Sequence, residues 1–489
     1  MRDCLVLYIN GRRHEVRGRD ALLSLSDFLR RRLRLIGTKI VCSEGDCGAC
    51  TVLVGRPASN PIPHSPLPIP FSYRPVDSCI QFMFQLDGTH VVTVEGLRPP
   101  GELNGVQQAL VDGHGSQCGF CTPGFAMAMT GLLEECDALD EPCLRGGLTG
   151  NLCRCTGYTQ IIEAGVAASA AEHERLNELY PASPMLRDFE ELSESPIEIH
   201  AESFGEMHLI SCPATLDGAL TFLAAHPTAI IVAGATDVGV RANKSQRLPA
   251  AILDLNRIVE LESVMIAGGE LRAGARASWT TLLAELTDSV PEFARIIAVF
   301  GAPQIRHVGT IGGNIANASP IADSLPFLLV MDATLELASA TGRRVVNIND
   351  FYRGYKQIDL RPGELIAQVR IPLPEADDLL RLYKVSRRRD LDIAGFTAAI
   401  RLRLDGETIA AASVALGAVG PTVLRPRRTE EFLVDRELSE ATMRAAGELA
   451  VEEITPIDDV RGAAEYRRQL TRNVFLKFYH QTQADLAPA

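Results

Sequence analysis

The stretch Cys42-Ser-Glu-Gly-Asp-Cys47-Gly-Ala-Cys50 places three cysteines on one short loop, and a fourth, Cys79, follows further along the chain. C-x4-C-x2-C with one remote cysteine is the spacing of the ligands of a plant-type [2Fe–2S] cluster. Three thiolates on a tight loop can wrap a small cluster, because Gly45 and Gly48 allow the backbone to approach it. Neighbouring N–H groups can then point at the sulfides. We therefore predict a cluster held by Cys42, Cys47, Cys50 and Cys79.

Zinc is the alternative for this loop. Structural zinc usually takes two C-x2-4-C pairs from two separate knuckles, whereas three of these cysteines share one loop. A Pro-rich segment over residues 56–75 lengthens the interval before Cys79, and we expect it to form a surface loop.

A second set of cysteines consists of the pairs Cys118-Gly-Phe-Cys121 and Cys153-Arg-Cys155. Each pair directly precedes a predicted helix. Thr122-Pro123 is suited to the N-cap and first turn of one helix, and the other is expected from near Tyr158 to about Glu174. A helix N-terminus favours thiolates and an anionic cluster. The spacing alone leaves zinc and iron–sulfur both open for this set.

Composition limits the remaining possibilities. A chain of 489 residues suggests three or four domains, and a net charge of −13 argues against a nucleic-acid surface. No run approaches the roughly 18–20 apolar residues of a membrane span, and Met1-Arg-Asp-Cys-Leu5 does not resemble a secretory signal, so we expect a cytoplasmic protein. The other four cysteines are expected to be ordinary buried residues: Cys4, Cys136, Cys143 and Cys212.

Local patterns predict the following elements. Asn10-Gly11 favours a type I′ turn between strands, and a linker rich in prolines and acids is expected over residues 180–205. The predicted strands cover 4–9, 12–16, 229–233, 251–255, 396–404 and 408–419, and the predicted helices cover 22–33, 280–286, 440–453 and 461–480.

Two Gly-rich segments are candidates for a cofactor's phosphates, although no G-x-G-x-x-G follows a strand. One is Ile231-Val-Ala-Gly-Ala-Thr-Asp-Val238, and the other runs from Gly309 to Asp323. Exposed N–H groups in such loops can hold a pyrophosphate. Thr310 and Asn314 could add hydrogen bonds, and Asp323 could accept from a ribose or flavin edge. The alternative is that both segments are tight turns between packed strands.

Three motifs resemble the signatures of the xanthine oxidase family of molybdenum hydroxylases. They are Glu44-Gly-Asp-Cys-Gly-Ala-Cys-Thr51, His114-Gly-Ser-Gln-Cys-Gly-Phe-Cys-Thr-Pro-Gly124 and Gly150-Asn-Leu-Cys-Arg-Cys-Thr-Gly-Tyr158. The resemblance implies a ferredoxin-like cluster at the first motif and a second cluster in a helical domain at the other two. It also implies that Gln117 hydrogen-bonds the pterin of a molybdenum cofactor on a partner subunit, with a solvent-facing polar residue as the alternative.

The Gly-rich segments are similar to those of the FAD domain of the same family. The resemblance places Tyr355 near the nicotinamide-accessible face of the flavin, and Lys384-Val-Ser-Arg-Arg-Arg-Asp390 resembles a segment that tunes flavin reactivity towards NAD or oxygen. A solvated basic run is the alternative for the latter, and simple core packing is the alternative for Phe300 and Ile366. The implied FAD contacts are Ile231, Val232, Ala233, Gly234, Ala235, Thr236, Asp237, Val238, Phe300, Thr310, Ile311, Gly312, Gly313, Asn314, Asp323, Ile366 and Lys384.

The fold implied by the resemblance is multidomain α+β. We expect a β-grasp ferredoxin-like domain over 1–97, a helical-bundle [2Fe–2S] domain over 98–180, a linker over 181–205, an α+β FAD-binding domain over 206–376 and a C-terminal α+β domain over 377–489. Because no molybdopterin-binding region follows the flavin region, the resemblance implies the small subunit of a xanthine dehydrogenase whose large subunit binds molybdopterin, in an α2β2 assembly.

The implied activity is an electron relay. Electrons from hypoxanthine or xanthine would pass from molybdenum through the Cys118 and then the Cys42 cluster to FAD, which reduces NAD⁺. No acid–base catalytic residue is assigned to this chain. The alternatives are the equivalent subunit of an aldehyde, nicotinate or CO dehydrogenase, a stand-alone NAD(P)H reductase, and a non-enzymatic protein with two structural zinc sites.

Overall fold

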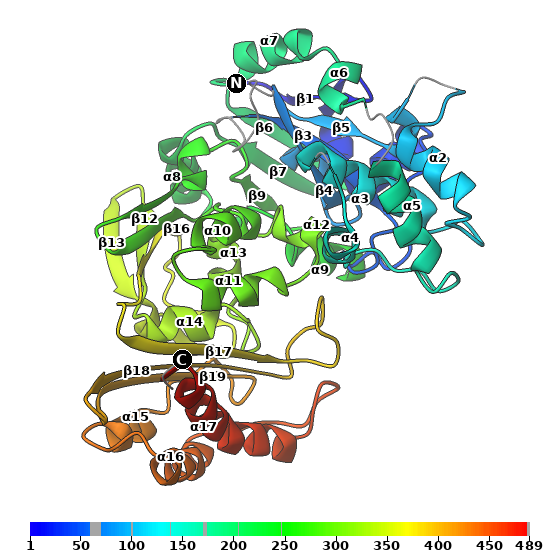
Figure 1. Cartoon of the computed structure of the whole chain (residues 1–489). Coiled ribbons are helices and arrows are strands. Elements are labelled where there is room, and N and C mark those ends of the chain that lie inside the picture. Colours follow the sequence, from blue (N-terminus) through cyan, green and yellow to red (C-terminus); the bar gives the residue numbers. More distant parts are fainter. Residues whose placement is uncertain are drawn as a thin grey trace. The chain divides into compact units, whose positions relative to one another are not determined.

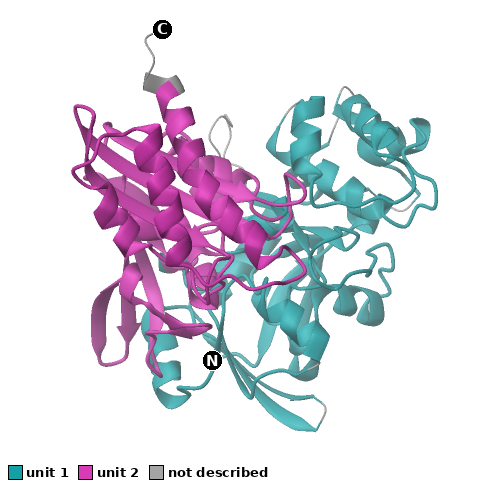
Figure 2. Ribbon diagram, turned by 90° about the horizontal axis from the view of Figure 1, so that it is seen from below, with its two compact units in different colours: residues 1–260, 302–309 teal, residues 261–301, 310–489 magenta. Residues whose placement is uncertain are grey.

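The computed structural model describes residues 1–58, 70–98, 101–136, 138–169, 174–203, 205–245 and 247–486. Contacts within the chain divide it into two units (Figure 2). Unit 1 comprises residues 1–260 and 302–309, and unit 2 comprises residues 261–301 and 310–489. The multidomain α+β fold class expected from the sequence is confirmed.

The first sheet of unit 1 is a β-grasp sheet with the strand order β2-β1-β5-β3-β4 (Figure 1). Its first two strands form the predicted hairpin, and Asn10 and Gly11 at the turn have φ angles of 49° and 73°. The strand β5 lies parallel to β1 and antiparallel to β3. The strands are β1 (Cys4–Ile9), β2 (Arg12–Arg17), β3 (Thr51–Pro57), β4 (Phe71–Asp77) and β5 (His90–Val92).

Two predictions for this region are corrected. The helix expected over 22–33 begins only at α1 (Leu25–Asp27), because the hydroxyl of Ser24 accepts from the Asp27 N–H at 3.1 Å and so caps the helix there. A π turn, Phe28–Arg32, continues it. The Pro-rich segment 56–75 is not loop throughout, since β3 and β4 extend into both of its ends and pair with each other. Residues 59–69 lie outside the described residues.

A helical region follows in unit 1, with a core of its own. Cys121, rather than Thr122, is the N-cap of α3, with Pro123 in the first turn. The predicted second helix is present from Thr159 to Ser169, and residues 170–173 of its expected range lie outside the described part of the chain. The helices are α2 (Gly105–Asp112), α3 (Thr122–Glu135), α4 (Glu141–Gly147), α5 (Thr159–Ser169) and α6 (Leu176–Leu179).

The segment predicted as a linker contains regular structure. The helix α7 (Ala182–Leu192) buries Met185 and Phe189, and the ring of Phe189 packs edge-on against Tyr8 at 5.7 Å. The strand β6 (Ile197–Ser203) alternates buried and more exposed residues and pairs with β7 (Glu206–Cys212). The prolines and acidic residues of the 180–205 segment obscured two patterns in the sequence. One is the apolar pair Met185 and Phe189 at i, i+4, and the other is the period-two alternation of β6.

The last sheet of unit 1 has the order β6-β7-β9-β8, with β7, β9 and β8 parallel. Parallel neighbours need crossover connections, and helices supply them here. The elements are α8 (Leu216–Ala225), β8 (Ile230–Val232), α9 (Val238–Ser245), β9 (Ala251–Asp254) and α12 (Pro303–Arg306). The 231–238 segment is therefore the connection between a parallel strand and the helix that follows it.

Unit 2 contains an antiparallel sheet of order β10-β11-β16-β12-β13, a hairpin and a three-stranded sheet, β17-β18-β19. The long hairpin β18–β19 and the helices near 280–286 and 440–453 agree with the predicted patterns. The strands are β10 (Val264–Ala267), β11 (Glu270–Gly274), β12 (Thr334–Ser339), β13 (Gly342–Asn347), β14 (Tyr352–Gly354), β15 (Gln357–Ile358), β16 (Leu365–Pro372), β17 (Asp378–Val385), β18 (Phe396–Asp405) and β19 (Thr408–Gly417). The helices are α10 (Trp279–Leu286), α11 (Pro291–Ala298), α13 (Ile311–Asn317), α14 (Leu325–Val330), α15 (Arg427–Leu433), α16 (Glu440–Glu452) and α17 (Ala464–Leu486).

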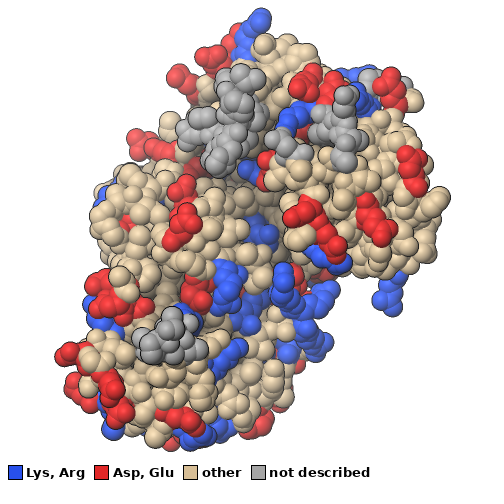
Figure 3. All heavy atoms as spheres, viewed as in Figure 1, with Lys and Arg blue, Asp and Glu red and all other residues tan. Residues whose placement is uncertain are grey.

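Acidic side chains are dispersed over the face shown in Figure 3, with basic side chains among them. Within the described residues, none of the helices combines the length and the apolar composition that crossing a bilayer requires.

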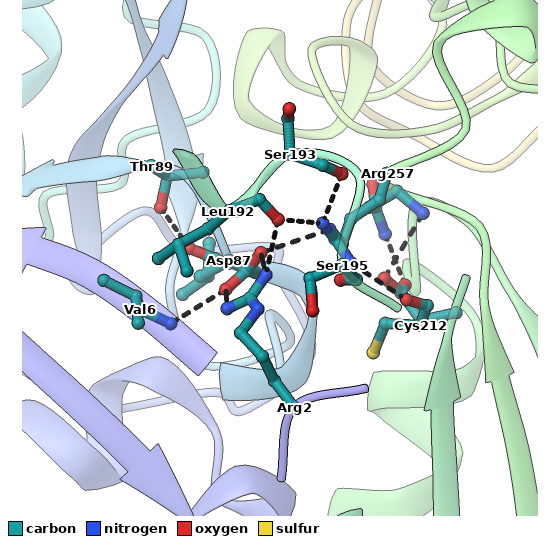
Figure 4. A network of polar contacts seen from close by, with 12 residues as sticks. Arg2, Val6, Asp87, Thr89, Leu192, Ser193, Ser195, Cys212 and Arg257 are labelled. Carbon is teal, nitrogen blue, oxygen red and sulfur yellow. Dashed lines mark hydrogen bonds and ion pairs between the residues drawn. The ribbon is translucent and has the colours of Figure 1, made fainter. Parts of the chain in front are cut away.

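A buried cluster of charges joins the N-terminal strand, the 192–195 segment and the β7–β9 region of unit 1 (Figure 4). Arg2 makes a two-pronged contact with the Asp87 carboxylate, with both N–O distances at 2.9 Å, and Arg257 approaches the same carboxylate at 3.1 Å. Arg257 also donates to the carbonyls of Ser195 at 2.7 Å and Leu192 at 2.9 Å. Burial lowers the pKa of Arg257. One carboxylate thus balances two buried guanidinium groups.

Replacing Asp87 by Asn should destabilise unit 1 by about 3–5 kcal/mol, because it removes the carboxylate that both Arg2 and Arg257 contact. Hydrogen exchange of the β1 and β5 amides, with urea unfolding followed by circular dichroism, measures the loss. The matched control is Arg32→Ala, which breaks the exposed Arg32–Asp20 pair and should change stability by no more than about 1 kcal/mol. Equal effects of the two changes would contradict the assigned role of Asp87.

The buried imidazole of His90 should make unit 1 sensitive to acid. Its Nε2 accepts from the Gly11 N–H at 3.0 Å, so the neutral ring carries its proton on Nδ1, 2.7 Å from the Tyr73 hydroxyl. Burial lowers the pKa of His90 to about 4, whereas an unfolded histidine has a pKa near 6.5. The neutral ring's contribution is complete above about pH 6.5 and falls by on the order of 3 kcal/mol as the pH drops towards 4.

Urea unfolding at a series of pH values tests this dependence. In His90→Gln, whose amide does not titrate, the slope of stability against pH between 4 and 6.5 should be smaller. Parallel curves for the two proteins would count against His90 as the source.

Candidate iron–sulfur and flavin sites

The four sulfurs of the first cysteine set lie together at the end of β3 and β4 of unit 1. The Cys42 side chain interacts with those of Cys47 and Cys79, and Cys79 also interacts with Cys50. These interactions place the pKa of Cys42 far below its ordinary value and raise the pKa of Cys47 and Cys79. The remote Cys79 therefore joins the three loop cysteines, as the spacing predicts.

Backbone N–H groups point at this set. The Glu44 N–H lies 3.4 Å from Cys42 Sγ, and the N–H groups of Asp46 and Glu44 both lower the pKa of Cys42. Positive φ angles at Ser43 and Gly48 wind the loop so that its amides face inwards. Such donors stabilise thiolates and tune a bound cluster.

Asp77 is a neighbour of this set that the sequence alone did not indicate. Its side chain is buried, and Oδ1 lies 3.6 Å from Cys50 Sγ. Burial, followed by the charge of Cys42, raises the pKa of Asp77 to about 7. The residue precedes Cys79 by only two positions, but only the fold brings it to Cys50.

The second set also brings four sulfurs together. Cys155 Sγ lies 3.7 Å from Cys118 Sγ, and Cys121 contacts Cys153. Burial and the hydrogen bond to Cys153 raise the pKa of Cys121 to about 12. Burial would raise the pKa of Cys153, but the hydroxyl and N–H of Thr156 outweigh it and lower that pKa. Both pairs precede helices, α3 and α5, as predicted.

The side chains of the first set form a continuous chain of contacts, and those of the second set meet in two pairs. Across the described ranges, no three His, Cys, Asp or Glu side chains are grouped as ligands of one ion would be. A [2Fe–2S] cluster takes four thiolates, two on each of its irons. The residues present therefore fit such a cluster at each set.

The 231–238 segment lies between β8 and α9 in unit 1. A Cβ on Gly234 would lie 2.0 Å from the Val308 carbonyl oxygen, so only glycine fits there. The Ala233 carbonyl accepts from the side chains of Gln85 at 2.7 Å and Asn256 at 2.8 Å. The segment is thus a rigid small-residue turn with a helix N-terminus at its end, which suits a phosphate.

The helix α9 connects this turn to the first cysteine set. Asn243 Nδ2 donates to the carbonyls of Ser43 at 3.0 Å and Cys79 at 2.9 Å. Lys244 pairs with Glu44 at 3.0 Å across an exposed surface. Sequence reasoning missed Asn243, because no motif marks an isolated asparagine in a short helix.

The flavin candidates of unit 2 converge on α13. Thr310 caps this helix by accepting from the Gly313 N–H at 3.1 Å, and Asn314 accepts from the Ser324 hydroxyl at 2.6 Å. Next to Ser324, Asp323 forms a buried ion pair with Lys384 at 2.7 Å. Lys384 Nζ also donates to the Val299 carbonyl at 3.0 Å, beside Phe300. These candidates therefore lie together within unit 2.

One carboxylate oxygen in this group is available to accept a hydrogen bond. Asp323 Oδ1 is buried and has no hydrogen-bond partner among the described residues, while Oδ2 faces Lys384. Burial raises the pKa of Asp323, although Lys384 opposes the rise. A buried acceptor without a donor is costly, so a ligand that donates there fits. Asp323 Oδ1 thus has the chemistry to accept a hydrogen bond from a ligand.

The remaining candidates are placed as follows. Gln117 is exposed beside Cys118, and Tyr355 is 61% exposed. Ile366 is buried in β16, and Phe300 packs edge-on against Trp279 at 5.1 Å. The positive charge of the 384–390 segment is partly neutralised by nearby carboxylates, because Arg388 pairs with Asp392 and Arg389 pairs with Asp390.

Four segments match descriptions of known domain families. Residues 7–67 match a 2Fe-2S iron–sulfur cluster binding domain, and residues 93–165 match a [2Fe-2S] binding domain. Residues 202–374 match the FAD binding domain in molybdopterin dehydrogenase, and residues 381–482 match the CO dehydrogenase flavoprotein C-terminal domain.

Whole-protein comparisons agree. The chain is 29% identical to xanthine dehydrogenase of Emericella nidulans, and the match covers 99% of this chain and 39% of that protein. It is also 29% identical to aldehyde oxidase 2 of Rattus norvegicus, again over 99% of this chain and 39% of that protein. It therefore spans about two fifths of the length of these relatives. A crystal structure of quinoline 2-oxidoreductase from Pseudomonas putida 86 superposes with a TM-score of 0.51 at 30% identity, covering 55% of this chain and 94% of that one.

These findings define an oxidoreductase chain with two [2Fe–2S] domains and an FAD-binding domain. The chain belongs to the xanthine oxidase/CO dehydrogenase family of molybdenum hydroxylases and forms an iron–sulfur and FAD electron-transfer component of it.

Replacing Gly313 by Val should lower the flavin content and leave the iron content unchanged. The new Cβ would lie 2.8 Å from Thr310 Oγ1 and disturb the α13 cap. Losing a cap costs about 1–2 kcal/mol, which corresponds to about a tenfold weaker flavin affinity. The flavin-to-iron ratio of the purified protein measures it.

The control is Gly462→Val, also in unit 2, whose Cβ would meet only the Tyr466 ring at 3.4 Å. It should keep its flavin. Equal loss of iron and flavin in Gly313→Val would show that the loop has another role.

Proposed function

We propose that this chain transfers electrons in a xanthine dehydrogenase, from a molybdenum cofactor on a partner subunit, by way of two [2Fe–2S] clusters and FAD, to NAD⁺. The overall reaction would convert hypoxanthine and xanthine to urate. When bound, the clusters carry one electron each and the flavin exchanges electrons singly or in pairs.

One observation carries the proposal: the candidate sites of unit 1 are in direct contact in relay order. The Leu152 N–H, next to Cys153, donates to the Cys47 carbonyl at 3.0 Å. On the other side of the first set, Asn243 of α9 holds the Cys79 carbonyl, and α9 directly follows the 231–238 turn.

We assign each residue the role suggested by its chemistry. The eight cysteines hold the clusters, and the 310–314 segment of unit 2 binds the FAD. Asp323 and Lys384 orient polar atoms of the FAD, and Phe300 and Ile366 pack near its ring. Tyr355 and the 384–390 segment lie on the side open to NAD⁺, and exposed Gln117 hydrogen-bonds the partner's pterin.

The proposed partner is a molybdopterin-binding large subunit in an α2β2 assembly. Its support is the exposure of Cys118, Cys155 and Phe120 around the second set, which leaves that set accessible to another chain. The family description that matches residues 202–374 also supports this partner, because it refers to a molybdopterin dehydrogenase.

An aldehyde-oxidising enzyme is the second candidate, because aldehyde oxidases match at the same identity as xanthine dehydrogenases. Assays of the co-purified complex with xanthine or with an aldehyde, each with NAD⁺ or oxygen, separate these functions. Full activity of the isolated chain with NAD(P)H alone and no large subunit would favour a stand-alone reductase instead.

Replacing Cys155 by Ser should block electron entry but not electron exit. The complex should lose reduction of its flavin by xanthine, and it should keep NADH-driven reduction of an artificial acceptor, because the first set and the flavin segments remain intact. Rapid-mixing absorbance of the flavin measures the first activity, and steady-state dye reduction measures the second.

The matched control is Cys136→Ser. This cysteine lies outside both sets and is exposed, not buried as expected from the sequence, and its replacement should keep both activities. Xanthine turnover retained in Cys155→Ser would overturn the proposed order of carriers.

A further inference from the structure

The loops of the two cysteine sets touch through their main chains. Leu152 lies between Asn151 and Cys153, and its N–H donates to the carbonyl of Cys47, itself a member of the first set. A path from Cys47 Sγ to Cys153 Sγ therefore runs along covalent bonds and crosses one hydrogen bond of 3.0 Å.

A buried amide holds this contact from the side. Asn151 is 2% exposed, and its Nδ2 donates to the Gly48 carbonyl at 3.0 Å. The same carbonyl accepts from the Thr51 hydroxyl at 2.7 Å. Asn151 thus binds the main chain of the first loop while belonging to the second.

A second buried amide holds the first in place. Gln304 of α12 is fully buried, and its Nε2 donates to Asn151 Oδ1 at 2.8 Å and to Thr51 Oγ1 at 3.2 Å. Its Nε2 therefore contacts one side chain from each loop. Because Asn151 Oδ1 accepts from Gln304, its amide is fixed with Nδ2 towards Gly48.

The main chains of the two loops are in close contact at Gly48. Gly48 has a φ of +66°, and a Cβ there would lie 2.3 Å from the Gly150 carbonyl oxygen. No side chain can separate the loops, so hydrogen bonds set their spacing. Buried interiors transmit such constraints because they have little free volume.

We propose that Asn151 and Gln304 are positioning residues that set the separation of the two cysteine sets, and with it the rate of electron exchange between the clusters. The inference deepens the proposed function and rests on its assignment of the eight ligands. Asn151 acts through the Gly48 carbonyl, and Gln304 acts through Asn151 and Thr51.

Two variants of the complete chain test the proposal. Asn151→Leu keeps the volume and removes the donor to Gly48, whereas Gln304→Met keeps the length and removes the donor to Asn151. Both should retain the iron content and the separate EPR signals of the clusters. The splitting from magnetic interaction between the two reduced clusters should change, and electron exchange between them should slow by about tenfold, a typical effect of losing an outer-shell contact at a metal site.

The matched control is Asn104→Leu in the same helical region. Asn104 is also buried and caps α2 by accepting from the Gln107 N–H at 2.8 Å, so its loss destabilises by about 1 kcal/mol without touching either loop. It should leave the splitting unchanged.

Unchanged splitting and unchanged exchange in both variants, with iron retained, would overturn the positioning role. Loss of iron from both variants would also overturn it, because the two amides would then fold the ligand loops rather than space them. Absence of iron from the unaltered protein would instead reject the ligand assignment and the proposed function itself.

Discussion

The main constraint on unit 1 is that the first cysteine loop is surrounded by main chain and buried amides from distant parts of the sequence. The carbonyls of Cys47, Gly48, Ser43 and Cys79 accept hydrogen bonds from Leu152, Asn151 and Asn243. Main-chain polar groups that leave water must be paired. The loop can therefore adopt its shape only when the helical region and α9 are in place.

Buried charges add a second level of specificity. Asp87 is shared by two guanidinium groups in unit 1, and Asp323 pairs with Lys384 in unit 2. Such pairs contribute less to stability than their attraction suggests, because each charge loses its hydration. However, a fold that buries one charge of such a pair without the other is strongly destabilised. In the Asp323 pair, one carboxylate oxygen faces Lys384 and the other has no hydrogen-bond partner among the described residues.

Local patterns predicted many elements well. The Asn10-Gly11 turn, the β18–β19 hairpin and α16 follow from turn chemistry and periodicity, which act over a few residues. The errors arose where tertiary contacts outweighed composition. Phe189 packing on Tyr8 makes a helix within the expected linker, and Ser24 delays the start of α1. The domain boundaries drawn from the sequence remain predictions.

The sequence by itself determined the chemistry: the spacing of eight cysteines, the helices that follow the second set and the small-residue turns. Spacing and residue type are local properties, so they can be read without a fold. Only the tertiary structure decided which sulfurs pair, which atom of Asp323 is left without a donor, and that Asn151, Gln304 and Asn243 hold the loops. These side chains reach partners more than 100 residues away, and hydrogen bonds at that separation leave no periodic trace in the chain because folding alone brings their atoms together.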